Sequence, residues 1–236
     1  NNEIAILRSS HIGNIEDLVS AINSQEPIVV EDFSHDINAP RQDVTHQIIK
    51  ADFYKRFKKF GRLEVQYDFQ NNQRFEYDVR VGNDRNKPAI DLTLKTHTVR
   101  SSVKLDSKNN ITYEFGANAG YQNNFANPDT GVRRLIPDYD KYDVGVFAFS
   151  NLRVNDKTNL DFGLRYDFNR IDAKKFYQTS RWIERGYDTD FGDIVIDYLG
   201  TQLLTNPVFD YHNVSASAGI AYKLNDHNSL IFNYGL

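Results

Sequence analysis

The sequence contains no cysteine and no methionine, and it has one tryptophan among its 236 residues. The lack of cysteine excludes disulfide bonds, catalysis by a thiol and zinc sites built from thiolates. No hydrophobic run approaches the length of a transmembrane helix, which excludes helical membrane spans. The formal net charge of -4 offers no positive potential for a nucleic acid, so we predict no nucleic-acid partner. These exclusions leave two possibilities, a β-rich domain in water and a β-rich domain in a membrane.

One stretch shows what kind of strand the chain contains. Residues 160–170 read LDFGLRYDFNR, in which apolar or aromatic side chains alternate with polar ones or glycine. Successive side chains of a strand point to opposite faces of the sheet, so this pattern predicts a β-strand with one apolar and one polar face. The same alternation recurs around residues 63–70, 111–122 and 214–224.

Four short segments resemble one another and lie between the alternating stretches. Each has an apolar residue at both ends and a polar centre rich in the residues that close tight hairpins. They are FKKFGRL (57–63), LDSKNNI (105–111), VNDKTNL (154–160) and LNDHNSL (224–230). They predict four tight turns between antiparallel strands, with long segments separating one turn from the next.

The alternation of short turns with long segments distinguishes two kinds of sheet. If a barrel strand has roughly ten residues, the long segments leave connections of about 20, 20 and 40 residues. In an up-and-down sheet these long loops all fall at one end and the tight turns at the other. A transmembrane barrel is built in this way, whereas a soluble sandwich has no reason to sort its loops. The polar positions also carry many Gly, Ser and Ala, where a wet surface favours Lys, Glu and Thr.

These patterns predict an all-β fold: an antiparallel transmembrane β-barrel segment of about eight strands, with short periplasmic turns and long extracellular loops. Strands near 44–56, 93–105 and 143–154 alternate less cleanly. In the last of these, Phe147 and Phe149 are out of phase with Val144 and Val146, which indicates either a bulge or an aromatic inner face.

We expect two regions along the chain. Residues 1–43 form an extracellular loop region with a short helix near 14–23, where apolar residues recur with helical spacing behind an Asn N-cap. Residues 44–236 form the strands and loops of a partial barrel. The chain does not begin with Met and its last residues continue a strand pattern, so we expect it to be an internal piece of a longer protein.

Candidate ligand-binding residues cluster in two of the long loops, at about 122–142 and 169–212. Arginine with aromatic neighbours suits an anionic, planar ligand, because the guanidinium forms paired hydrogen bonds and rings stack. The candidates are Arg133, Arg134, Tyr139, Arg181, Trp182 and Arg185. A structural explanation competes with this one, since the same side chains also serve to hold loops together.

Catalysis finds no support in the sequence. There is no nucleophile elbow, phosphate-binding loop or paired-carboxylate signature, and the six histidines lack metal-binding spacing. We therefore predict that the chain is not an enzyme, has no cofactor and holds no metal through its own side chains.

The runs NPDTGVRRLIPDYDKYDVGVFAFSNLRV (127–154) and NVSASAGIAYKLNDHNSLIFNYGL (213–236), with GLRYDFNRIDA (163–173), resemble the barrel of TonB-dependent outer-membrane receptors of the Bacteroidetes type. The resemblance implies a 22-stranded barrel in the bacterial cell outer membrane, surrounded by lipid. It also implies an N-terminal plug that contacts the TonB energy transducer, and active uptake of an extracellular nutrient chelate, such as a ferric siderophore. The alternatives are a passive outer-membrane channel or structural barrel, and a soluble all-β ligand-binding domain.

Overall fold

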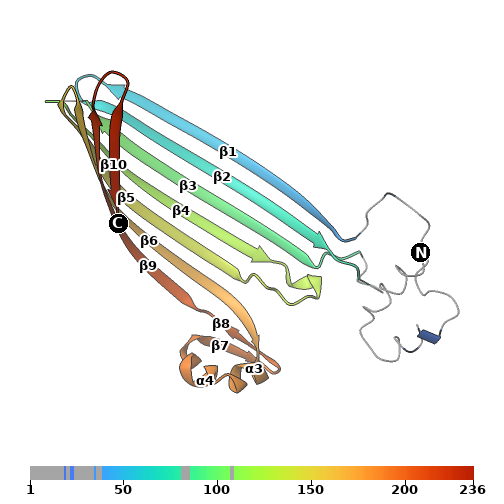
Figure 1. Ribbon diagram of the computed structural model, residues 1–236. Helices are drawn as coiled ribbons and strands as arrows, with labels where there is room; N and C mark the ends of the chain where they lie inside the picture. Colours follow the sequence, from blue (N-terminus) through green and yellow to red (C-terminus); the bar gives the residue numbers. More distant parts are fainter. Residues whose placement is uncertain (1–18, 20–21, 24–34, 36–38, 81–85, 107–108) are drawn as a thin grey trace. The chain divides into compact units, whose positions relative to one another are not determined.

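The computed structural model describes residues 19, 22–23, 35, 39–80, 86–106 and 109–236. A ten-stranded sheet accounts for most of these residues (Figure 1). Its strands are β1 (Arg41–Phe57), β2 (Gly61–Tyr77), β3 (Ile90–Leu105), β4 (Ile111–Ala126), β5 (Asp138–Asn155), β6 (Thr158–Gln178), β7 (Val195–Leu199), β8 (Gln202–Thr205), β9 (Val208–Lys223) and β10 (Ser229–Gly235).

The strands follow one another in space as they do in the chain, from β1 through β6, and β6 then pairs with both β8 and β9. The ladders between β3 and β6, and from β6 through β9 to β10, are antiparallel. All four predicted tight turns join neighbouring strands at one end of the sheet (Figure 1). The predicted antiparallel strands and turns are thus confirmed. Two short strands, β7 and β8, were not predicted.

The long connections are shorter than expected, because the strands are longer. β6 has 21 residues and β5 has 18, where the prediction assumed roughly ten. The connections at the loop end of the sheet therefore shrink to residues 78–89, 127–137 and 179–207. The extra strand residues keep their ladder hydrogen bonds with neighbouring strands, which favours extending the sheet over forming free loop.

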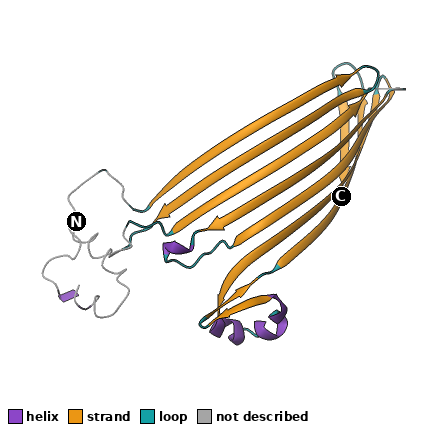
Figure 2. Ribbon diagram, turned by 180° about the vertical axis from the view of Figure 1, so that it is seen from behind, coloured by secondary structure: helices purple, strands orange, loops and turns teal. Residues whose placement is uncertain are grey.

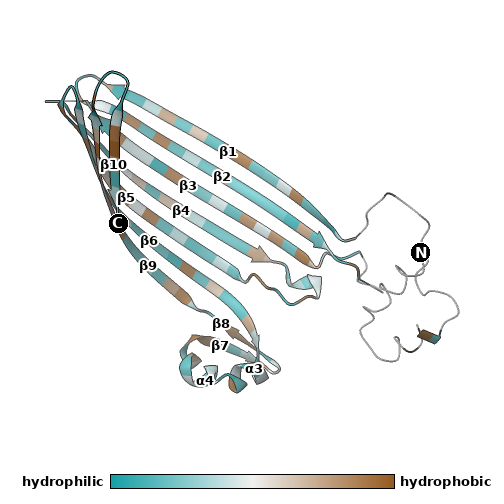
Figure 3. Cartoon of the chain, in the orientation of Figure 1, coloured by the Kyte–Doolittle hydropathy of each residue, from teal (hydrophilic) through white to brown (hydrophobic). Residues whose placement is uncertain are grey.

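Hydrophilic and hydrophobic residues alternate along the strands (Figure 3), so the two faces of the sheet differ in chemistry, as predicted. We call the face that carries Leu164 the apolar face and the face that carries Arg165 the polar face. Leu164 lies opposite Ala148 on β5 and Ala216 on β9, and its side chain is 57% exposed. Large apolar side chains along this face are exposed on strand after strand, among them Val99, Phe115, Val146, Phe162 and Val214. A face of this kind requires a covering that is not water.

The pairing of β5 decides between a bulge and an aromatic inner face at Phe147 and Phe149. Phe147 pairs with Gly116 on β4 and with Arg165 on β6, without a bulge at either position. Both Phe147 and Phe149 therefore lie on the polar face, and the aromatic inner face is the correct interpretation. Space for the ring of Phe147 comes from Gly116, where an added Cβ would lie 2.3 Å from the ring.

The loop after β6 folds into a small structure of its own (Figure 2). It contains α3 (Thr179–Glu184), α4 (Tyr187–Asp190), a 3-10 turn η3 (Gly192–Ile194) and the β7–β8 hairpin, with β8 paired to the end of β6. Trp182, Leu203 and Thr205 are almost fully buried here. None of the helices in the described part of the chain is long and apolar enough to cross a membrane.

The described residues divide into two compact units. One contains residues 74–91 and 127–134 with the N-terminal stretch, and the other contains residues 45–73, 92–126 and 135–236. The helix predicted near 14–23 falls largely outside the described residues.

Candidate functional site

The six candidate ligand-binding residues fall in both units, and each group is described by itself. Arg133 and Arg134 belong to the smaller unit, whereas Tyr139, Arg181, Trp182 and Arg185 belong to the larger one. The structure therefore defines two local environments for them.

Arg133 and Arg134 follow an anchored loop. The loop begins with the 3-10 turn η2 (Pro128–Thr130), whose N-cap Asn127 accepts a hydrogen bond from the Asp129 backbone N–H. The Asn127 side chain also donates to Asp91, at 2.8 Å, and the guanidinium of Arg80 donates to the Thr130 carbonyl at 2.9 Å. These bonds tie residues 127–130 to the start of β3 and to the β2–β3 connection. Sequence analysis missed Arg80, because nothing in its neighbourhood signals a partner fifty residues away.

Tyr139 lies on the polar face at the loop end of β5. Its hydroxyl donates to the Gln122 side chain at 2.9 Å, and the Gln122 amide donates in turn to Thr96 at 3.0 Å. This chain of bonds crosses β5, β4 and β3. The ring is thus held in a fixed position on the wall of the sheet.

Trp182 is a core residue of the loop after β6. Its ring packs between those of Tyr177, at 5.0 Å, and Tyr187, at 5.3 Å, and only 3% of the residue is exposed. Arg181 and Arg185 lie at the surface of the same loop, and the Arg185 guanidinium lies 6.0 Å from the Tyr187 ring centre. In this loop the tryptophan supports the fold, while the two arginines are accessible to a ligand.

A polar cluster on the polar face was not predicted from the sequence. The Arg165 guanidinium donates to Asp167 on its own strand, at 2.6 Å from Nε, and to Asn118 on β4 at 2.8 Å. To reach Asn118 it crosses β5 at the buried Gly145, where an added Cβ would lie within 2.7 Å of atoms of all three side chains. The sequence does place Gly145 on the polar face, which indicates a close approach by another side chain. Only the register of β5 with β4 and β6 shows that Asn118 and Arg165 are its neighbours.

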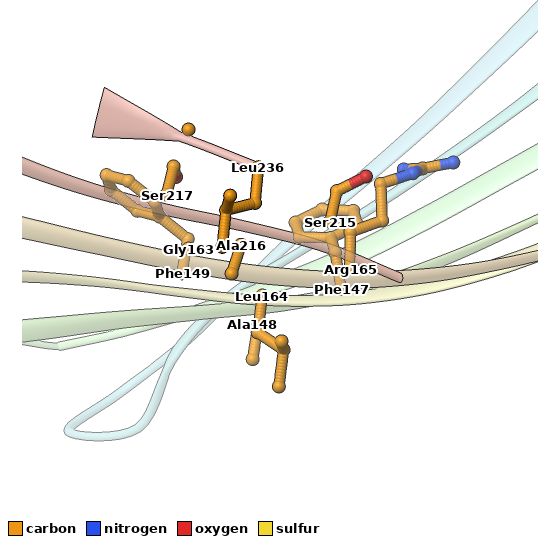
Figure 4. Close-up of a pocket in the computed structure, with 11 residues that line it drawn as sticks. Phe147, Ala148, Phe149, Gly163, Leu164, Arg165, Ser215, Ala216, Ser217 and Leu236 are labelled. Atoms are coloured by element: carbon orange, nitrogen blue, oxygen red, sulfur yellow. The ribbon is translucent and has the colours of Figure 1, made fainter. Parts of the chain in front are cut away.

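Beside this cluster the larger unit has a cavity of about 460 Å³ (Figure 4). Arg165, Phe147, Phe149, Ser215 and Ser217 line it from the polar face, whereas Leu164 and Ala148 project from the other side of the sheet. It combines aromatic rings, hydroxyls and one guanidinium. Among the described residues, no group of three or more His, Asp or Glu side chains is placed to hold a metal ion.

A curved antiparallel sheet with an exposed apolar face, a polar opposite face and all its tight turns at one end defines a wall of a transmembrane β-barrel. The family model described as "TonB dependent receptor-like, beta-barrel" matches residues 26–236, so the chain belongs to this family of receptor barrels of the bacterial outer membrane.

Solved structures support the same fold. The chain is similar to the FrpB iron transporter from Neisseria meningitidis (13% identity, TM-score 0.58, 84% of this chain and 29% of that one). It is also similar to the ferric-catecholate import receptor Fiu from E. coli K12 (10%, 0.55, 82% and 35%) and to the copper transporter OprC (14%, 0.53, 84% and 31%). The chain thus spans about a third of these proteins. A search of curated protein sequences finds no match.

Proposed function

We propose that the full-length protein takes up an anionic metal chelate, most simply a ferric siderophore, by active transport that depends on the TonB energy transducer. The observation that carries the proposal is the pair of exposed arginines, Arg181 and Arg185, on a loop with its own buried core. The two guanidinium groups offer local hydrogen-bond donors to an anion, in a loop that also exposes Glu184 and four aspartates. Because the backbone of this loop is already folded, it loses little conformational entropy when the ligand binds. A metal chelate already fills the coordination shell of its metal, so it requires charge and flat surfaces from the protein and no metal ligands.

Three further features support the proposal. Tyr139 is fixed on the polar face at the loop end of the sheet, where a ligand entering from outside would pass. Arg133 is exposed and follows a loop that Arg80 anchors. Similar folds include an iron transporter, a ferric-catecholate receptor and a copper transporter, as their names state.

The test is accumulation of radiolabelled iron, as a ferric catecholate and as ferric citrate, by cells that express the full-length receptor. We expect uptake that stops when the proton gradient is collapsed, since a passive channel would continue to equilibrate. Replacing both Arg181 and Arg185 by Ala should weaken binding. Arg153→Ala, at the turn end of β5, is the matched control and should not. Accumulation of an uncharged nutrient but of neither iron chelate would contradict the proposal, as would equal effects of the loop and control substitutions.

A further inference from the structure

Two histidines on the apolar face occupy equivalent environments far apart in the sheet. Tyr67 Oη lies 2.9 Å from Nδ1 of His97, and Tyr166 Oη lies 2.7 Å from Nδ1 of His212. Each imidazole also packs on a phenylalanine, with ring centres 4.8 Å apart for Phe69 and His97. The corresponding distance for Phe168 and His212 is 5.1 Å. The same arrangement of three side chains therefore occurs at the β2–β3 seam and at the β6–β9 seam.

Both pairs lie where the apolar face ends towards the loops. On β6 the apolar positions run from Leu160 to Phe168, a length of strand that matches the nine to eleven residues needed to cross a bilayer. On β9 the corresponding positions run from His212 to Ile220. Rings of Tyr121 and Tyr142, 5.1 Å apart, continue the row between the two seams. The row therefore marks the boundary between hydrocarbon and headgroups on the outer side.

An imidazole at this boundary has one polar atom left to satisfy. Nδ1 of each histidine pairs with tyrosine, but Nε2 makes no hydrogen bond to any residue in the described part of the chain. A polar atom without a partner at the edge of the hydrocarbon layer is unfavourable, so Nε2 of each histidine is poised to take a partner from the headgroup layer.

A cation lies one pleat farther out beside each pair. Lys95 precedes His97 by two residues on the apolar face of β3, and Arg170 follows Phe168 by two on β6. Both are exposed. Arg170 also contacts Asp210 at 3.5 Å, a long and exposed ion pair that contributes little and can be shared with a second anion. Each seam thus offers a cation, an imidazole and a tyrosine hydroxyl above an apolar strip.

We propose that the Tyr67–His97–Lys95 and Tyr166–His212–Arg170 groups are two binding sites for the phosphate headgroup of an outer-leaflet membrane lipid. The cation and the Nε2–H of the imidazole hold the phosphate by charge-assisted hydrogen bonds. The acyl chains lie on the apolar face below, so a soluble phosphate lacks half of the contacts. The proposal does not depend on which nutrient the receptor transports.

The test uses the full-length receptor in detergent, with phosphatidic acid, phosphatidylcholine of the same acyl chains, or inorganic phosphate as probe. We expect phosphatidic acid to raise the Tm most and to be retained in native mass spectrometry. Inorganic phosphate should change neither. Equal effects of the two lipids, or the same Tm rise from inorganic phosphate, would overturn the proposal.

Substitutions locate the sites. Lys95→Gln combined with Arg170→Gln should remove most of the additional Tm rise caused by phosphatidic acid, and His97→Phe combined with His212→Phe should reduce lipid retention. The matched control is Lys104→Gln combined with Arg153→Gln, which removes the same charge from the polar face. Each Tm rise is measured against the same variant without lipid. A loss as large in the control would show that net charge alone attracts the lipid, and would refute the assigned residues.

Discussion

The loop after β6 and the sheet that carries it differ in whether they enclose a core. In the loop, Trp182 and Leu203 are buried, although Ile183 and Ile196 around them are exposed, and the arginines are exposed at the surface. In the sheet, Leu164 and Val214 are more than half exposed, while Gly145 on the polar face is buried. The comparison shows that the loop has a core suited to water, whereas the apolar face of the sheet is suited to lipid. Strand β6 runs from the lipid-facing sheet into the loop.

The largest expected effect concerns the loop. Trp182→Ala removes the ring that holds Tyr177 and Tyr187, and truncation of a buried tryptophan costs about 3–5 kcal/mol. The loop should lose its protection from hydrogen exchange while the strands from β3 to β5 keep theirs. Ile183→Ala is the control, since Ile183 is 58% exposed, and it should leave the exchange rates nearly unchanged. Loss of protection throughout the sheet would show that the loop has no core of its own.

The next effect tests the apolar face. Leu164→Arg in the full-length receptor should lower the free energy of unfolding in lipid by about 2–4 kcal/mol if Leu164 lies near the bilayer midplane. Arg165→Gln, one residue away on the polar face, should cost less, because its surroundings are polar. Equilibrium unfolding in lipid vesicles measures both. Equal costs would mean that the two faces are wrongly assigned.

A smaller effect is expected at Gly145. An added methyl group would lie 2.5–2.7 Å from Asn118, Arg165 and Asp167, so Gly145→Ala must displace their hydrogen bonds. Overpacking of this kind costs about 1–3 kcal/mol. Gly192→Ala is the control, since an added Cβ there meets no atom within 4 Å. Unfolding midpoints of the two variants should differ, and indistinguishable midpoints would exclude the described cluster.

The smallest effect concerns the anchored loop at 127–134. Arg80→Met removes the hydrogen bond to the Thr130 carbonyl and should cost about 1 kcal/mol locally. Because residues 1–236 contain no cysteine, Arg133→Cys introduces a single site for a nitroxide label within them, and the label should become more mobile when Arg80 is replaced. Arg74→Met, which removes an exposed ion pair with Glu76, should not change the label's spectrum. An unchanged spectrum in both variants would contradict the anchoring role of Arg80.

Prediction from the sequence succeeded where one local pattern decides the structure. The alternation at 160–168 and the polar centres of the four turns fix strand direction and face without any distant partner. It could not reach features that depend on distant partners. Trp182 and Arg185 look alike in the sequence as parts of an Arg–aromatic cluster, but packing against Tyr177 makes one a core residue and leaves the other exposed. The strand lengths failed for the same reason, since ladder partners decide where β6 ends. The roles of the six candidate residues in ligand binding stay a prediction.

The reach of Arg165 across β5 has a consequence for how the strands find their alignment during assembly. Slippage of β5 by one residue would place Val144 or Val146 under the guanidinium in place of Gly145, and every other side chain of the strand would change faces. A valine there would force the side-chain ends of Asn118, Arg165 and Asp167 apart, so that they would lose their mutual hydrogen bonds. The Arg165 cluster therefore favours the correct register of β5 over a shift by one residue in either direction. One glycine and one arginine thus help to align β4, β5 and β6 as the barrel wall forms.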